Sequence, residues 1–330
     1  MKAVVVRQFG PVESHQVESL PDPVPGPDDV VIEVEAAETN YPDVLVVSGK
    51  YQVKPPLPFT PGKGAAGRIA AVGSKVKNFA IGQRVAAQVE YGAYAEKLRT
   101  PASTCYPVPD SVSAVDAAAS LLTHQTAWFA LKDRARFSPG ERVLVLGAGG
   151  GVGVASIQIA KALGAGFVIA GTRGAAKLDV VRAAGADDVV DLSQPNLRDG
   201  LRINVHRLTQ GHGVDIVLDP IGGAAFEAAL RCLAWRGRHV VMGFAGGDIP
   251  SVRANYLLVK NIEVSGLQAS DYRDRCPEDA AEAQAEIFHM IDSGLFRPLV
   301  TETLPLESFA VALAKLETGR ASGKIVLSLK

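Results

Sequence analysis

A glycine-rich turn is the feature of this sequence with the clearest chemical meaning. The apolar run Val143–Leu146 leads directly into Gly147-Ala148-Gly149-Gly150-Gly151-Val152-Gly153, and a helical pattern follows. Such glycines let the backbone turn tightly and let a pyrophosphate approach without a Cβ in its way, while the helix N-terminus offers unpaired amides to the anion. Because another strand is predicted about 20 residues later, the pattern favours dinucleotide binding over a tight turn without a ligand.

Two cations after the second predicted strand indicate which dinucleotide is bound. The strand Phe167–Ala170 is followed by Arg173 and Lys177, and no acidic residue occurs before Asp179. A carboxylate at that place would take the ribose hydroxyls of NADH and repel a 2′-phosphate, whereas a guanidinium can pair with that phosphate. We therefore predict NADPH rather than NADH. The alternative is that both cations only solvate a helix start, where they gain nothing from the macrodipole.

The histidines and cysteines form no recognisable metal motif. The three cysteines are far apart and include no C-x-x-C pair, and none of the six histidines forms an i, i+4 pair or lies near a cysteine. This spacing predicts ordinary thiols in a reducing compartment rather than a disulfide framework. The apolar run at the N-terminus is too short for a signal peptide, so the expected location is the cytoplasm. A zinc site assembled from distant residues stays open on spacing alone.

Apolar strands alternate with helical segments from Glu141 onward. The strands are expected at Val143–Leu146, Phe167–Ala170, Asp188–Val190, Val214–Leu218, His239–Met242 and Ile262–Val264. Continuous apolar strands that alternate with helices are typical of a parallel sheet with helices on both faces. The prediction is an α/β fold with one doubly wound, Rossmann-type sheet of about six strands.

The first third of the chain has a different pattern, in which short apolar runs are separated by turn residues. These runs are Ala3–Val6, Val30–Val34, Ile69–Val72, Val85–Val89 and Ala93–Leu98. They predict a barrel-like or sandwich domain. The C-terminal stretch, about 60 residues, is too short for a domain of its own and is expected to complete the first one. We therefore predict a discontinuous β-rich domain, residues 1–120 and 268–330, with the dinucleotide-binding domain, residues 121–267, inserted.

Length and charge agree with this organisation and argue against some partners. At about 150 residues per domain, 330 residues suggest about two domains. The 34 basic and 35 acidic side chains give a net charge of −1, so there is no long-range electrostatic reason to bind nucleic acid or an anionic membrane. The uncharged stretch 143–160 contains five glycines and divides into strand, turn and helix, so it is not predicted to span a membrane.

Further motifs are spread over the whole chain. They are Asn40-Tyr41-Pro42-Asp43, Ser48-Gly49-Lys50-Tyr51, Tyr91–Glu96, Leu122–Ala127 and Ser322–Val326. Together with the glycine turn they make the chain resemble the zinc-independent NADPH:quinone oxidoreductases, the group of the medium-chain dehydrogenase/reductase superfamily that includes zeta-crystallin. The resemblance implies a GroES-like substrate domain, a Rossmann domain and a cleft between them for NADPH. It also implies a homodimer or homotetramer joined through the edge of the Rossmann sheet, near Ile262–Val264.

The same resemblance predicts a site without metal. Zinc-dependent relatives carry a cysteine where Asn40 stands and Gly-His-Glu where this chain has Gly62-Lys63-Gly64. A lysine at the histidine position is a cation that would resist a second one. The chain also departs from the quinone reductases themselves at Gly64, where they usually carry a glutamate, and at Leu192, where they often carry an aromatic or polar residue.

The resemblance implies a role for each candidate site residue. Asn40, Asp43 and Tyr51 would line the nicotinamide end of the cleft as catalytic residues; the alternatives are that Asn40 bonds only to backbone and that Tyr51 only packs. The cofactor-binding residues would be Thr126 at the nicotinamide or its ribose, Gly150, Gly151, Val152 and Gly153 at the pyrophosphate, Thr172, Arg173 and Lys177 towards the 2′-phosphate, and Gly243, Phe244 and Lys324 closing the site. His124 is expected to be structural.

Without a Lewis acid, hydride transfer favours substrates that carry their own electron sink. We therefore predict NADPH-dependent reduction of quinones. The first alternative is an enone or 2-enoyl-thioester reductase, and a coenzyme A substrate would then need Arg99, Arg253 or Arg273 to come together at the rim of the cleft. The second alternative is an NADPH-binding protein with little catalysis.

Overall fold

The computed structural model describes residues 1–329, and the chain divides into two compact units. The discontinuous unit is formed by Met1–Leu122 and Ser270–Lys330, and the continuous unit by Thr123–Ala269. The two ends of the chain therefore fold together, while the middle of the chain folds by itself.

The continuous unit is built on one six-stranded sheet. Its strands are β8 (Arg142–Val145), β9 (Phe167–Thr172), β10 (Asp188–Asp191), β11 (Val214–Asp219), β12 (Leu233–Val241) and β13 (Glu263–Gly266). They lie in the order β10-β9-β8-β11-β12-β13, and every neighbouring pair is parallel. The chain reverses its direction of winding between β8 and β11, which is the doubly wound arrangement of a Rossmann sheet. The predicted fold class is confirmed.

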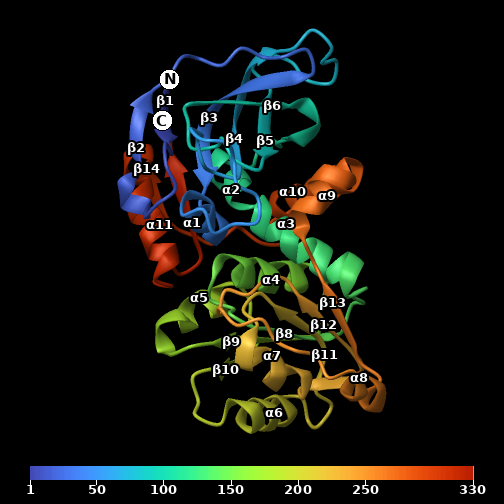
Figure 1. The fold of residues 1–330 in the computed structure, drawn as a ribbon. Helices are drawn as coiled ribbons and strands as arrows, with labels where there is room; N and C mark the ends of the chain where they lie inside the picture. Colours follow the sequence, from blue (N-terminus) through green and yellow to red (C-terminus); the bar gives the residue numbers. More distant parts are fainter. Residues whose placement is uncertain (330) are drawn as a thin grey trace. The chain divides into compact units, whose positions relative to one another are not determined.

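Helices cover both faces of this sheet (Figure 1). They are α3 (Leu122–Phe129), α4 (Gly151–Ala162), α5 (Leu178–Ala183), α6 (Leu197–Leu208), α7 (Gly223–Leu230) and α8 (Ala254–Lys260). In Figure 1, α4 and α5 lie on one face of the sheet and α6 and α7 on the other. Leu144, Ile169, Val217 and Phe226 are completely buried in this core. Removing such side chains from water is the main force that fixes the helices on the sheet.

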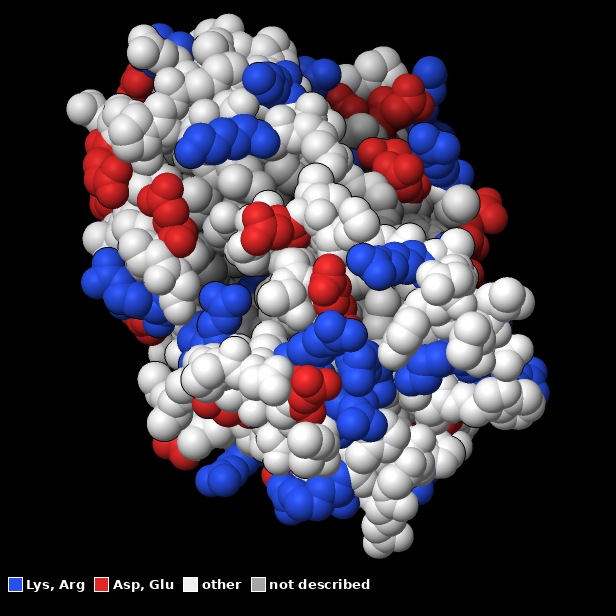
Figure 2. Space-filling view, turned by 60° about the horizontal axis from the view of Figure 1, so that its bottom comes forward, with Lys and Arg blue, Asp and Glu red and all other residues white. Residues whose placement is uncertain are grey.

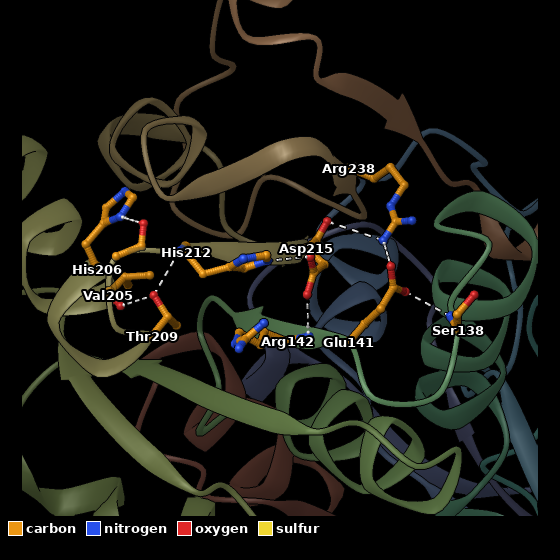
Figure 3. A network of polar contacts seen from close by, with 11 residues as sticks. Ser138, Glu141, Arg142, Val205, His206, Thr209, His212, Asp215 and Arg238 are labelled. Atoms are coloured by element: carbon orange, nitrogen blue, oxygen red, sulfur yellow. Dashed lines mark hydrogen bonds and ion pairs between the residues drawn. The ribbon is translucent and has the colours of Figure 1, made fainter.

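Polar contacts tie the amino ends of β8 and β11 to Arg238 of β12 (Figure 3). Asp215 accepts a hydrogen bond from the backbone amide of Arg142 at 2.8 Å, and its other oxygen lies 3.1 Å from His212 Nε2. Glu141 forms an ion pair with Arg238, and it also accepts a hydrogen bond from the amide of Ser138 at 2.8 Å. These contacts occupy the amino edge of the sheet, so the carboxyl edge, where such folds bind their ligands, is the place to look for a site.

The discontinuous unit contains a seven-stranded sheet to which both ends of the chain contribute. Its strands are β3 (Asp29–Glu38), β4 (Gly64–Val72), β5 (Arg84–Gln88), β6 (Lys97–Pro101), β7 (Cys105–Pro107), β14 (Val300–Pro305) and β15 (Lys324–Ser328). The order is β14-β15-β3-β4-β5-β7, and β6 also pairs with β3. A separate antiparallel pair joins β1 (Lys2–Val5) to β2 (Gln16–Ser19). Because β15 pairs with β3, C-terminal residues lie beside residues from the first 40.

One strand begins later than the apolar run predicts. The run 93–98 was expected to be extended throughout, but β6 starts at Lys97. The amides of Ala93 and Tyr94 donate instead to the carbonyls of Gly62 and Pro61, at 3.1 and 2.9 Å. Tyr94 is completely buried by this detour, so its hydroxyl is held inside the unit.

Five helices pack around this sheet. They are α1 (Tyr41–Val47), α2 (Ala114–Ala119), α9 (Ala269–Arg275), α10 (Pro277–Asp292) and α11 (Phe309–Glu317). Val44 and Val47 of α1 share one buried cluster with Leu313 of α11 and with Ile32 and Ile69 of the sheet. This packing fixes α1, and with it the polar residues at its N-terminus.

The surface carries charges of both signs. Figure 2 shows acidic and basic side chains interspersed over one face of the molecule, in keeping with the net charge of −1. No helix between residues 1 and 329 combines the length and the apolar character that crossing a bilayer requires.

Candidate functional site

The glycine turn between β8 and α4 has the geometry of a phosphate cradle. Gly147 has φ +59°, and the amide of Ala148 donates to the carbonyl of Gly171 in β9 at 3.0 Å. A Cβ at Gly153 would lie 2.5 Å from the carbonyl oxygen of Gly147, so only glycine allows α4 to pack this close to the turn. The first helical hydrogen bond from α4 back to the turn runs from Val154 to the carbonyl of Gly150. The amides at 151–153 therefore precede the helical bonding pattern and face the turn, as an anion site requires.

Lys177 lies against this turn. A Cβ at Gly149 would be 2.4 Å from Lys177 Cδ, so the stem of the lysine covers the glycine backbone. Burial lowers the pKa of Lys177. Arg173 is exposed just beyond the end of β9, whose last residue, Thr172, is buried. Both predicted cations thus follow β9, and Lys177 is the one that contacts the glycine turn.

The carboxylate of Asp191 forms hydrogen bonds near the loop that carries Arg173. Asp191 is the last residue of β10 and accepts hydrogen bonds from the amide and hydroxyl of Ser193, at 2.8 and 2.7 Å. A further hydrogen bond comes from the backbone of Gly174, and together these contacts lower the pKa of Asp191. Leu192 is buried beside it, and a Cβ at Gly171 would touch Leu192 Cδ1 at 3.2 Å. The leucine thus fills the space beside β9 with an apolar side chain.

Two further loops meet at the carboxyl ends of β11 and β12. The amide of Ala245 donates to the carbonyl of Pro220 at 3.1 Å, which holds Gly243 and Phe244 near the loop after β11. Phe244 is 43% exposed. Thr126 is buried within α3 of the same unit. These three predicted residues all belong to the continuous unit, as do the residues of the glycine turn.

On the discontinuous unit, a buried polar cluster surrounds the N-terminus of α1. Lys324 Nζ donates to Asn40 Oδ1 at 2.7 Å, to Glu38 Oε2 at 2.7 Å and to the carbonyl of Thr39 at 3.2 Å. Asn40 is only 4% exposed, yet its Nδ2 has no hydrogen-bond partner among the described residues. Lys324 is therefore in direct contact with the Asn40 side chain. The Nδ2 atom of Asn40 is a buried donor that has no acceptor among residues 1–329.

Asp43 is the most strongly perturbed acid of this cluster. Its Oδ2 accepts hydrogen bonds from the amide of Asn40 at 2.8 Å and from the hydroxyl of Tyr94 at 2.9 Å, while Oδ1 has no partner among residues 1–329. Burial raises the pKa of Asp43 to about 7, although the positive charge of Lys63 and both hydrogen bonds oppose the shift. Burial also raises the pKa of Tyr94 well above its usual value. Asp43 can therefore hold a proton near neutral pH.

Tyr51 is attached to the cluster through Lys63. The Lys63 ammonium lies 4.5 Å from the centre of the Tyr51 ring, a cation–π contact. Lys63 is buried and pairs with the carboxylate of Glu90, which also accepts a hydrogen bond from Arg273 at 3.1 Å. The structure thus brings Asn40, Asp43 and Lys324 into direct contact with one another or with shared partners, and it connects Tyr51 to them through a cation.

Three members of this cluster escaped the sequence analysis as site residues: Glu38, Tyr94 and Lys63. A glutamate that follows Ala36 and Ala37, two residues before Asn40, is the signal that could have pointed to Glu38. Two of the three arginines considered for a coenzyme A thioester already form ion pairs with carboxylates. Arg99 pairs with Asp29 at 2.6 Å, and Arg273 pairs with Glu90.

The titratable side chains of residues 1–329 show no arrangement suited to a metal. Among residues 1–329, no three or more His, Cys, Asp or Glu side chains gather closely enough to hold an ion. Cys105 and Cys232 are buried thiols, and burial raises the pKa of each to about 12. His124 is buried in α3, with its Nε2 3.1 Å from Gln158 Oε1.

Comparisons with known proteins agree in fold and chemistry. Residues 26–110 match the alcohol dehydrogenase GroES-like domain, and residues 151–285 match the zinc-binding dehydrogenase family model. The chain is 37% identical to quinone oxidoreductase-like protein 2 of Mus musculus, over 95% of this chain and 88% of that protein. It is 33% identical to the quinone oxidoreductase of Mus musculus, over 100% and 98%. Its fold is similar to the crystal structure of Escherichia coli quinone oxidoreductase complexed with NADPH, with a TM-score of 0.89, 30% identity and coverage of 99% and 100%.

Proposed function

The chain belongs to the zinc-independent quinone oxidoreductases of the medium-chain dehydrogenase/reductase superfamily, and on this premise we propose that it reduces quinones by hydride transfer from NADPH. It is an oxidoreductase. The NADPH complex of the Escherichia coli enzyme and the names of the two mouse relatives support the cofactor and the substrate class.

The observation that carries the proposal is the buried, unpartnered amide of Asn40 beside Asp43. A buried donor without an acceptor costs about 1–3 kcal/mol, and a ligand oxygen that accepts from it would remove that cost. When a hydride adds to a quinone, negative charge develops on a carbonyl oxygen, and a fixed N–H donor stabilises that charge. Asn40 Nδ2 is such a donor, because Lys324 holds the other end of the amide.

The reaction needs one proton for every hydride. A quinone that gains a hydride becomes a hydroquinone anion, and a proton on its oxygen completes the hydroquinone. Asp43, whose pKa burial raises to about 7, can hold that proton near neutral pH, and it hydrogen-bonds to the backbone of Asn40. We assign Asp43 the role of proton store, with Tyr94 as the hydroxyl that donates to the same oxygen, Oδ2, as the Asn40 amide.

The continuous unit has the features that NADPH binding requires. When bound, NADPH supplies the hydride. The glycine backbone at 147–153 leaves room that a Cβ would fill, and the first amides of α4 suit the pyrophosphate. Lys177, packed on Gly149, and Arg173 would pair with the 2′-phosphate, while Thr126, Thr172, Gly243 and Phe244 would complete the site.

An enone is the second candidate substrate. Its carbonyl oxygen would accept from Asn40 Nδ2 just as a quinone oxygen would, because both develop charge on oxygen after hydride addition. An enoyl thioester of coenzyme A receives less support, since two of the three arginines considered for it, Arg99 and Arg273, are already paired with carboxylates.

The test is NADPH oxidation by the purified chain with 1,4-benzoquinone, 9,10-phenanthrenequinone, a simple enone and an enoyl thioester, with NADH and a chelator as controls. We expect chelator-insensitive turnover of the quinones with NADPH. The Asn40→Ala variant should lose about 100-fold or more of the turnover, as removal of an oxyanion donor does. The matched control is Asn78→Ala, an exposed asparagine of the same unit. Turnover of the enone alone would move the substrate to the second candidate, and NADPH binding without any turnover would refute the enzymatic proposal.

We also propose that two copies associate through β13. This strand is an edge of the six-stranded sheet, so its outer backbone groups lack a strand partner among residues 1–329. Leu258 and Val259 of the preceding helix α8 are 78% and 76% exposed. A dimer or tetramer joined at this edge would cover them.

We propose a cytoplasmic location for the protein. The proposal is supported by three cysteines that form no disulfide. A fluorescent fusion of the chain tests it.

A further inference from the structure

A buried carboxylate lies where three strands of the discontinuous unit meet. Glu38 ends β3, Gly64 begins β4 and Lys324 begins β15. In the sheet register Ala37 faces Ala65, so Glu38 and Gly64 are the next cross-strand neighbours, with side-chain positions on one face. A Cβ at Gly64 would lie 2.6 Å from Glu38 Oε1. The glutamate of β3 therefore fills the space into which a side chain on β4 would project.

Both charges of the resulting pair are fully buried and fully bonded. Glu38 is 0% exposed and Lys324 is 2% exposed. One oxygen of Glu38 accepts from Lys324 Nζ at 2.7 Å, and the other accepts from the backbone amide of Leu122 at 3.1 Å. Lys324 uses its remaining donors on Thr39 and Asn40. A buried ammonium without such a counter-charge would be strongly disfavoured, so Glu38 is what holds Lys324 in place.

We propose that Glu38 is a positioning residue for the reductase: through Lys324 it fixes the orientation of the Asn40 amide so that Nδ2 faces a ligand oxygen. An ammonium has only donors, so it can meet the amide only at Oδ1. With Oδ1 held, the NH2 group must point away from Lys324, where it is buried without a partner. The value of this orientation to catalysis rests on the proposed function, whereas the orientation itself does not.

The cross-strand geometry also makes the residue at position 64 important for the contact between Glu38 and Lys324. Glu38 and Gly64 are a reciprocal pair, because a carboxylate can enter the shared space from β3 or from β4 but not from both. A glutamate at 64 added to the native chain would collide with the carboxylate of Glu38 and place two like charges together. If Glu38 is replaced by glycine at the same time, a carboxylate from β4 can take over the contact with Lys324.

The experiment compares Glu38→Gln, Glu38→Gly, Gly64→Glu and the double variant Glu38→Gly/Gly64→Glu in the full chain. Glu33→Gln, an exposed glutamate on the same strand β3, is the matched control. Three quantities are measured: kcat and KM for 1,4-benzoquinone, the NADPH Kd from cofactor fluorescence, and the side-chain amide signals of Asn40 in a sample labelled with 15N-asparagine. Thermal unfolding identifies any variant that fails to fold.

We expect Glu38→Gln to lower kcat by about tenfold to 100-fold, less than or equal to the loss from Asn40→Ala, because the donor is misoriented rather than removed. The Asn40 amide signals should shift in Glu38→Gln and stay unchanged in Glu33→Gln. The double variant should recover most of the kcat and the native amide signals, whereas each single glycine or glutamate change should not.

Two results would overturn the inference. One is a folded Glu38→Gln variant with native kcat and native Asn40 amide signals. The other is a folded double variant no better than Glu38→Gly alone. If the wild-type chain reduces none of the acceptors, the proposed function fails, but the amide signals still decide whether Glu38 orients Asn40. The failure of one proposal is thus separate from the failure of the other.

Discussion

Burial of Asp43 should make the stability of the protein depend on pH in a direction opposite to that of most aspartates. The pKa of this carboxyl is raised from 3.8 to about 7 in the folded protein. The folded state therefore binds the proton more tightly than the unfolded state between these two pH values. Its contribution to stability is fully present below pH 3.8 and is lost as the pH rises through 7.

The size of the effect follows from the shift. One pKa unit corresponds to about 1.4 kcal/mol, so the whole shift corresponds to about 4 kcal/mol. Between pH 5 and pH 7 the free energy of unfolding of the wild type should fall by about 2 kcal/mol relative to that of Asp43→Asn, which cannot titrate there. Asparagine has nearly the same shape and still accepts from Tyr94, so the comparison isolates the charge.

Urea unfolding followed by far-UV circular dichroism at pH 5, 6, 7 and 8 measures this difference. Both tryptophans, Trp128 and Trp235, lie in the continuous unit, so their fluorescence serves as a reference signal from the unit without Asp43. Asp110→Asn, at a fully exposed position, is the matched control and should follow the wild type at every pH. If Asp43→Asn shows the same pH slope as the wild type, the carboxyl does not titrate near 7 and its role as a proton store is wrong.

Three further predictions concern the cofactor site and the assembly. The double variant Arg173→Ala/Lys177→Ala should raise the KM for NADPH by about tenfold or more per lost charged contact and leave the KM for NADH nearly unchanged. An equal rise in both KM values would contradict pairing with the 2′-phosphate. Gly153→Ala should destabilise the protein by about 1–3 kcal/mol and weaken NADPH binding, because the new Cβ would meet backbone at 2.5 Å, while Gly266→Ala, where the Cβ meets nothing, should leave NADPH affinity unchanged in a cofactor fluorescence titration. Leu258→Asp should shift the protein from a dimer or tetramer towards a monomer in light scattering, and an unchanged mass would argue against association through β13.

The signals in the sequence that point to the proposed cofactor site are local. The glycines of the turn, the strand before them and the helix after them are adjacent in sequence, and each imposes its conformation on its neighbours. Arg173 and Lys177 follow the next strand within a few residues, so the topology alone places them beside the turn. The same holds for Asn40 and Asp43, three residues apart, where the side chain of the second bonds to the backbone of the first at 2.8 Å.

Periodicity and short-range spacing are sufficient to predict the doubly wound sheet, the glycine turn proposed for the pyrophosphate and the two polar residues at the start of α1. What those polar residues can do depends on contacts between segments that are far apart in the sequence. Lys324 reaches Glu38 and Asn40 only because β15 pairs with β3, and these contacts span 286 and 284 positions. The raised pKa of Asp43 likewise comes from its burial in the packed unit. The absence of a side chain at Gly64 is explained by the carboxylate of Glu38 on the neighbouring strand, which fills that space. Burial and pairing between distant strands depend on the packed fold as a whole, and no local pattern encodes them.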